Sequence, residues 1–307
     1  MTRFEQVRLR RRLDRMAEAW RGPAGPVGTL PFLAELTGTL RRVEWAAGWR
    51  EVVRDHPIAR LVWQDPLTDW AFRHGPAGHA VLLDFLHDHP GLRPALAAAT
   101  PGGQAVHLFT SGSEFAVALR EGARLVAHAL DAAVGRTGSA EVLAVGCGHL
   151  PELAWSHRAG EAARIVALSA EAEPLREAMA RHAALGNVEC VCAAPARLAE
   201  RPRRHGRFDL IHALRGLDAL EGAAAARFAL ALFEALKPGG RLILDSFAVD
   251  LRDEGYMDAF MDWRPAQRRE RDLQELLRAL PLAEVERAAI LRGNNGAMLY
   301  ALVDRRG

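Results

Sequence analysis

The run VLAVGCG (142–148) constrains the fold of this chain more than any other segment. Its apolar residues predict a buried strand, and two glycines follow that strand directly. Because glycine has no Cβ, the backbone there can turn sharply and approach a ligand closely. In an α/β sheet, a glycine turn at the carboxyl end of a strand indicates a nucleotide-like ligand at the topological switch point. A nicotinamide-binding fingerprint would need a third glycine where Pro151 stands, so that class of ligand is disfavoured.

Apolar strands and amphipathic helices alternate through the rest of this half of the chain. We expect strands at 141–146, 164–169, 187–192, 207–214 and 239–247, and helices at 151–159, 171–185, 222–236 and 269–280. Asn294-Asn295-Gly296 lies between apolar runs, which predicts a terminal hairpin. This order predicts a parallel sheet with helices on both faces and an antiparallel edge.

The first 133 residues show no reliable strand alternation and are expected to be helical. Candidate helices are 3–21, 31–54, 57–63, 67–72, 78–87 and 113–133, with a Pro- and Gly-rich break at 90–103. We therefore expect two domains: an N-terminal helical domain at 1–112, acting as a lid with substrate contacts, and a sheet domain at 113–307.

Composition excludes several classes of function. The net charge is +2, so no strong field favours nucleic acid or an anionic membrane. No apolar stretch is long enough to span a bilayer, and the charged N-terminus does not resemble a signal peptide. The odd number of three cysteines suggests no disulfide framework, and the histidine spacing favours no metal site. We expect a bacterial, cytoplasmic protein without a metal, with a homodimer left open.

Further motifs follow the glycine turn in a fixed order: LSAE (168–171), CAA (192–194), FDLIH (208–212) and LKPGG (236–240). This ordered set resembles class I methyltransferases that use S-adenosylmethionine (SAM). The resemblance implies a Rossmann-like sheet of order 3-2-1-4-5-7-6. It also implies a set of cofactor contacts, which are Gly146, Cys147, Gly148, Glu152, Ser169, Glu171, Ala193 and Ala194. Arg120 is a further cofactor candidate: it lies one helical turn from Arg124, and either arginine could pair with a substrate or cofactor carboxylate, or with a surface neighbour such as Glu121.

A narrower resemblance covers nearly the whole chain. It rests on VWQDPLTDWAF (62–72), GPAGHAVLLDFLHDHP (75–90), CGHLPEL (147–153), FDLIHALRGLDAL (208–220) and YMDAFMDWRPAQR (256–268). These segments are similar to proteins for the biosynthesis of the 3-hydroxypalmitic acid methyl ester extracellular factor. That resemblance implies carboxyl O-methylation of a small organic or acyl acid, in secondary metabolism or signalling.

Individual residues are assigned roles on this basis. His212 and His149 are candidate catalytic bases, since histidine titrates near neutral pH. Trp63, Trp70, His79 and Asp218 are candidate contacts of a small-molecule substrate.

Some positions depart from the subgroup pattern. Ser169 stands where an acid would hold the ribose, with Glu171 as its substitute, and tyrosine is absent at His212, Ala219 and Gln267. The alternative hypothesis is therefore a divergent relative that binds SAM without methyl transfer. It would be a partner subunit, or an enzyme that attacks the aminobutyryl chain of SAM.

Overall fold

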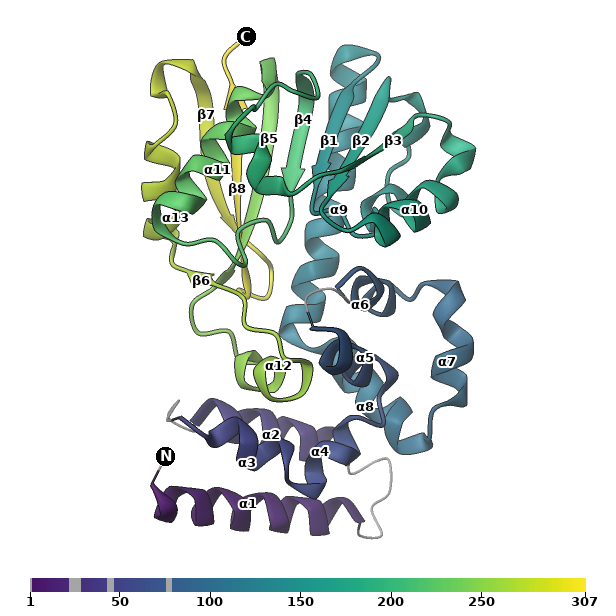
Figure 1. The fold of residues 1–307 in the computed structure, drawn as a ribbon, viewed down its shortest axis with the longest axis vertical. Coiled ribbons are helices and arrows are strands. Elements are labelled where there is room, and N and C mark those ends of the chain that lie inside the picture. The colour runs from purple at the N-terminus through teal and green to yellow at the C-terminus, as the bar shows by residue number, and fades with distance from the viewer. Residues whose placement is uncertain (1, 22–28, 43–46, 76–78) are drawn as a thin grey trace. The chain divides into compact units, whose positions relative to one another are not determined.

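The computed structural model describes residues 2–21, 29–42, 47–75 and 79–307, and it divides into two compact units. The first unit comprises Met1–Val117 and Asp250–Arg264, and the second comprises Ala118–Val249 and Pro265–Gly307. The boundary falls inside one helix, α9 (Glu114–Thr137), which begins in the first unit and continues in the second (Figure 1). The segment Asp250–Arg264, which the sequence reading left with the sheet, belongs to the helical unit.

All the regular secondary structure in the described part of the first unit is helical. Its helices are α1 (Arg3–Arg21), α2 (Thr29–Arg42), α3 (Trp49–Arg54), α4 (Pro57–Val62), α5 (Pro66–His74), α6 (His79–Leu86), α7 (Arg93–Ala98), α8 (Pro101–Gly112) and α12 (Glu254–Met261), with a 3-10 turn at Pro90–Leu92. The expected helix at 31–54 is two helices, α2 and α3, and residues 43–46 between them lie outside the description.

The expected break at 90–103 is wrong, because α7 and α8 begin within it. Their prolines lie in the first helical turn, where a missing N–H is tolerated. The Thr100 hydroxyl accepts a hydrogen bond from the Gly103 amide at 3.0 Å and caps α8. Prolines and glycines in the first turn of a helix thus give the same sequence pattern as a break between helices.

Long-range hydrogen bonds hold α12 in the helical unit. The Trp63 indole donates to the Phe260 carbonyl at 3.0 Å, and Arg54 donates to the Ala259 carbonyl at 2.8 Å. The buried hydroxyls of Thr110 and Tyr256 lie 2.9 Å apart. Helix α12, which the sequence did not predict, is thus part of this core.

The second unit is built on a mixed sheet. Its strands are β1 (Glu141–Val145), β2 (Arg164–Ser169), β3 (Val188–Cys192), β4 (Phe208–Ala213), β5 (Leu236–Ala248), β6 (Gln267–Arg268), β7 (Val285–Arg292) and β8 (Met298–Arg305). Its further helices are α10 (Ala172–Arg181), α11 (Gly222–Glu234) and α13 (Glu270–Arg278), with 3-10 turns at Pro151–Ala154, Ala159–Glu161, Ala183–Leu185, Pro195–Ala199 and Leu282–Glu284.

The strand order is β3-β2-β1-β4-β5-β8-β7, with the short β6 beside β5. Strands β1 to β5 are parallel, whereas β8 runs antiparallel to both β5 and β7. Apart from the two-residue β6, this is the predicted order, and the terminal hairpin is confirmed. The architecture is the expected α/β, Rossmann-like fold of class I methyltransferases with N-terminal helices.

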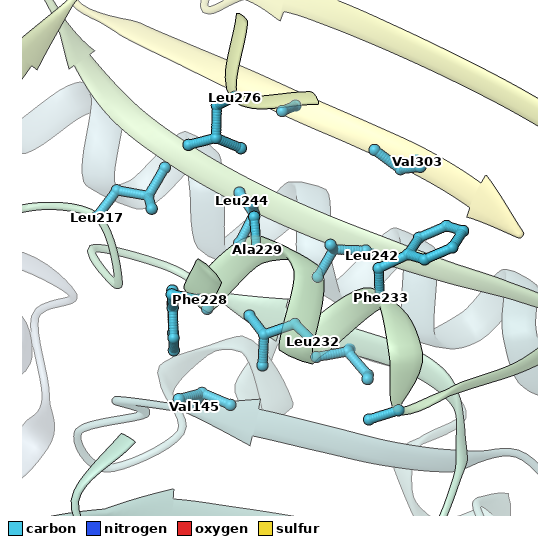
Figure 2. Packing of buried hydrophobic residues seen from close by; sticks show 14 of the residues in the cluster. Val145, Leu217, Phe228, Ala229, Leu232, Phe233, Leu242, Leu244, Leu276 and Val303 are labelled. Carbon is cyan, nitrogen blue, oxygen red and sulfur yellow. The ribbon is translucent and has the colours of Figure 1, made fainter. Parts of the chain in front are cut away.

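Helices cover both faces of the sheet. On one face, α11 and α13 pack on the strands, and Figure 2 shows Phe228, Leu232 and Phe233 of α11 in one apolar cluster with Leu242 and Leu244 of β5. On the other face lie α9 and α10. Each fully buried large apolar side chain contributes about 1.5–3 kcal/mol, so these layers stabilise the sheet. None of the helices in the described ranges combines the length and apolar character that crossing a bilayer requires.

Candidate functional site

The glycine turn lies at the carboxyl end of β1, beside the carboxyl end of β2. Gly146 and Gly148 have left-handed φ angles of 67° and 54°, which only glycine adopts readily. The Gly146 amide donates to the Leu168 carbonyl of β2 at 2.8 Å, and this bond anchors the turn. A Cβ built on Gly146 would meet no atom within 4 Å, so the turn opens onto free space. This is the cradle that the sequence predicts.

The chain after the turn is not the expected helix at 151–159 but two 3-10 turns, Pro151–Ala154 and Ala159–Glu161. The cause is Asp131 on α9, whose carboxylate accepts the Ser156 hydroxyl at 2.5 Å and the Arg158 amide at 3.0 Å. These bonds draw the chain across α9 before a regular helix can form.

Glu152 and His212 form a buried pair at this end of the sheet. The Glu152 Oε1 atom lies 3.2 Å from His212 Nε2, and each side chain is 3% exposed. Glu152 comes from the 3-10 turn after β1, and His212 lies near the end of β4. Among the described residues, His212 Nδ1 has no hydrogen-bond partner, and Glu152 Oε1 has only its 3.2 Å contact with His212. Buried polar atoms normally have partners, so the His212 Nδ1 atom indicates a place where a polar ligand binds.

A second set of polar residues, Arg215, Asp218 and Asp245, lies near the carboxyl ends of β4 and β5. The Arg215 amide donates to Asp245 Oδ1 at 2.5 Å, and its guanidinium reaches the Gly146 carbonyl at 3.5 Å. Arg215 has a left-handed φ of 62°, a strained conformation for a side chain with a Cβ. Burial raises the pKa of Asp245 to about 6, although the Arg215 amide and charge oppose the rise. Asp218, in the loop after β4, has a buried Oδ2 atom without a partner in the described chain.

The sequence analysis missed Arg215 and Asp245. Asp245 stood inside the apolar strand segment LILDSF (242–247), and an acid at a buried strand position is itself a signal of function. The position of Arg215 carried no comparable signal.

The expected ribose and adenine contacts lie at the carboxyl ends of β2 and β3. The Ser169 hydroxyl accepts the Glu171 amide at 3.2 Å, and the Ser169 carbonyl accepts the Ala193 amide at 2.9 Å. Desolvation raises the pKa of Glu171, which the Arg215 charge partly offsets. Ala194 and Glu171 are exposed, so both could meet a ligand.

Two other candidate site residues are more deeply buried than Ala194 and Glu171. Cys147 and His149 are each 6% exposed. Burial, with the nearby charge of Glu152, raises the pKa of the Cys147 thiol to about 12, so the thiol stays neutral. The His149 carbonyl contacts the ring of His182 at 3.0 Å. On α9, burial and the charge of Arg124 lower the pKa of Arg120, which marks a partly desolvated cation.

The predicted substrate contacts fall in both units. Trp63 packs on Phe72 at 4.3 Å between ring centroids, and Trp70 stacks on His74 at 3.8 Å, all within the helical unit. His79 begins α6, but its side chain lies outside the described part of the structure. Asp218 belongs to the sheet unit, with the cofactor candidates.

The site fits a SAM-like ligand by its own chemistry. The open glycine turn suits an adenosyl compound, and the buried carboxylate of Glu152 suits an ammonium group. Within the described ranges, no group of three or more His, Cys, Asp or Glu is placed to hold a metal ion.

Comparison with known proteins agrees with this geometry. Residues 142–240 match the sequence profile described as a methyltransferase domain. That span includes the glycine turn, Glu152, His212 and Asp218. The sheet order and this match show a class I methyltransferase fold, and they support SAM as its cofactor.

Several solved structures are similar to this chain at low sequence identity. A structure from Bordetella parapertussis, described as a possible exported protein, is 15% identical with a TM-score of 0.60, covering 94% of this chain and all of its own. The N-methyltransferase NodS from Bradyrhizobium japonicum, solved with S-adenosylhomocysteine, is 15% identical with a TM-score of 0.41, covering 60% and 87% of the two chains. The 1,6-didemethyltoxoflavin N1-methyltransferase from Burkholderia thailandensis is 21% identical with a TM-score of 0.42, covering 62% and 81%. Among curated proteins, no sequence matches this chain. The narrower resemblance to the methyl ester biosynthesis proteins stays a prediction.

Proposed function

We propose that this chain is a SAM-dependent methyltransferase that acts on a small organic molecule. The observation that carries the proposal is the open glycine turn after β1, with the buried Glu152–His212 pair beside it, inside a segment that matches a methyltransferase domain. Fold alone does not define function, so the proposal rests on the placement of these groups.

The proposed cofactor contacts lie at the carboxyl ends of different strands. The backbone at Gly146 faces the open space, and Glu171 and Ser169 at the end of β2 are assigned to the ribose. Glu152 is assigned to the amino group, and Arg120 to the carboxylate. Ala193 and Ala194 offer small side chains beside an adenine ring. When bound, SAM supplies a methyl group on a sulfonium, already activated for displacement.

The protein therefore contributes mainly alignment and water exclusion. His212 is held through Nε2 by Glu152, which leaves Nδ1 as its available atom. At 3% exposure, the His212 ring also keeps bulk water from this end of the sheet. We keep His149 as the second candidate base. Trp63, Trp70 and His79 of the helical unit stay predicted substrate contacts.

Product analysis tests the proposal. The purified chain is incubated with SAM and a panel of hydroxylated and plain carboxylic acids, and the products are separated by mass spectrometry. S-adenosylhomocysteine together with a methyl ester would support both methyl transfer and the carboxyl acceptor implied by the narrower resemblance. Methylthioadenosine would instead identify attack on the aminobutyryl chain. Absence of SAM binding in calorimetry would reject the proposal.

A further inference from the structure

Three acids lie at the carboxyl ends of the central strands. Glu152 follows β1, Asp218 follows β4, and Asp245 lies within β5. Glu152 and Asp245 are each 2% exposed, and the Oδ2 atom of Asp218 is buried. Burying a carboxylate without a partner is costly, so such a group implies a cation or a proton at this place.

The cations nearby do not satisfy Asp218. Arg268 donates to the Leu217 carbonyl at 3.1 Å and to the Ser246 hydroxyl at 3.0 Å, and Arg215 points to the Gly146 carbonyl. Their charges lower the pKa of Asp218, but burial and the charge of Asp245 outweigh them and raise it to about 8. Asp218 therefore keeps an unused oxygen. With no cation of the described chain paired to it, Asp218 holds a proton at neutral pH, and it must lose that proton before an ammonium ion can pair with it.

His212 supplies an observation independent of the acids. Its ring is 3% exposed, contacts Glu152 through Nε2, and leaves Nδ1 without a partner in the described chain. Its charge also acts on Asp245, so the ring belongs to the same group of side chains. Unused buried atoms on both an acid and a base indicate a polar ligand rather than a closed structural network.

Asp218 and Asp245 lie apart from the residues assigned to the adenosyl part of SAM. The residues assigned to ribose and adenine lie beyond β2 and β3, whereas Asp218 and Asp245 lie beyond β4 and β5, on the other side of β1. A methyl acceptor approaching from the β4 side would therefore meet Asp218.

We propose that the acceptor of this methyltransferase carries an amine, which enters as an ammonium ion, pairs with Asp218 and gives its proton to Asp218 Oδ2. This inference rests on the proposed function and names its substrate class. A carboxylate acceptor would form no ion pair with Asp218, and the charge of Asp245, which acts on Asp218, would oppose a second negative charge beside it. The carboxyl acceptor expected from the sequence resemblance is thus the competing outcome of the test.

The reaction balances without a further reagent. The ammonium N–H proton passes to Asp218, and the freed nitrogen lone pair bonds to the methyl carbon. The methyl–sulfur bond breaks, and its electron pair stays on the sulfur. The products are a methylated ammonium ion and S-adenosylhomocysteine, and Asp218 then releases its proton.

A binding experiment tests the proposal without turnover. Wild-type protein is first titrated with S-adenosylhomocysteine, and the saturated complex is then titrated with primary amines from ethylamine to hexylamine. Each amine is matched by the carboxylic acid of the same carbon number. We expect amines to bind and acids not to bind. Because Asp218 must lose its proton to pair with an ammonium, amine affinity should rise by about tenfold or more between pH 6 and pH 8.

Two variants complete the experiment. Asp218→Asn keeps the side-chain shape and should weaken amine binding by about 30-fold or more, with affinity for S-adenosylhomocysteine unchanged. Glu275→Gln removes an exposed acid of α13 and should change neither affinity. Wild-type protein that fails to bind S-adenosylhomocysteine would overturn the proposed function itself. Cofactor binding with no amine binding, tighter binding of acids, a flat pH profile, or normal amine binding by Asp218→Asn would overturn only the amine proposal.

Discussion

Glu152 Oε1 and His212 Nε2 face each other across 3.2 Å, although they come from different strand ends and both side chains are 3% exposed. The pair joins the turn after β1 to β4, on the two sides of the topological switch point. Ligands of parallel sheets bind at this point. The pair therefore links the stability of the sheet to the cofactor site.

This link predicts energetic coupling between the two residues. Glu152→Gln and His212→Gln should each lower the free energy of unfolding, because each leaves a buried polar partner unsatisfied. The double variant should lose less than the sum of the two, by about 1–2 kcal/mol. Urea denaturation of the four proteins measures this coupling. Strictly additive effects would show that the contact contributes nothing.

The left-handed turn at Gly146 predicts a specific cost for a side chain. Gly146→Ala should lower the free energy of unfolding by about 1–2 kcal/mol, since an L-residue is strained at a φ of 67°. Its methyl group would also enter the open space, and SAM affinity should fall by about tenfold or more. Gly38→Ala is the matched control: its Cβ likewise meets no atom within 4 Å, but Gly38 lies within α2. It should stabilise the protein by about 0.5–1 kcal/mol. Equal effects at both sites would contradict this account.

Asp218 predicts a stability difference that depends on pH. Its folded pKa is raised to about 8, above the ordinary value of 3.8, so the folded protein binds a proton more tightly than the unfolded chain. Folding stability therefore falls as pH rises between about 4 and 8. Asp218→Asn removes this loss, so it should be more stable than wild type by about 5 kcal/mol at pH 8.5, with the difference shrinking toward pH 4. Thermal melts across this pH range measure the difference. A difference independent of pH would rule out the raised pKa.

Replacing Lys237 should lower the stability of the protein without changing its affinity for SAM. Its ammonium lies 2.7 Å from Glu141 and 2.8 Å from Asp209, and it joins the amino ends of β1, β4 and β5. Lys237→Met should lower the free energy of unfolding by about 1 kcal/mol, because each bond is partly exposed. SAM affinity should stay within about twofold, since the cofactor site is at the opposite strand ends. A large loss of affinity, measured by calorimetry, would contradict this separation.

The sheet was predictable because its pattern is local. The apolar runs of β1, β2 and β4 and the glycine turn carry their own signal, and the Asn-Gly sequence marked the hairpin. In that hairpin, only Gly296 of the pair Asn295-Gly296 has a left-handed φ, at 78°, and the Gly293 amide closes the loop on the Met298 carbonyl at 2.8 Å. The turn was thus located correctly, although its geometry is that of a longer loop.

The features that the sequence did not predict depend on contacts between residues far apart in the chain. Asp131 on α9 converts the expected helix after the glycine turn into 3-10 turns, and no local pattern reveals that. Glu152 and His212 were chosen separately, and only the fold brings them together. Arg215 depends on the strained turn after β4 and on Asp245 of β5, so sequence spacing carried little information about it.

Calorimetric titration of the purified chain with SAM tests the central claim most directly. The open turn at Gly146 and the buried Glu152–His212 pair predict one binding site per chain, with a dissociation constant of about 1 to 100 μM. Absence of binding heat from SAM and from S-adenosylhomocysteine, in a chain shown to be folded by circular dichroism, would contradict the account.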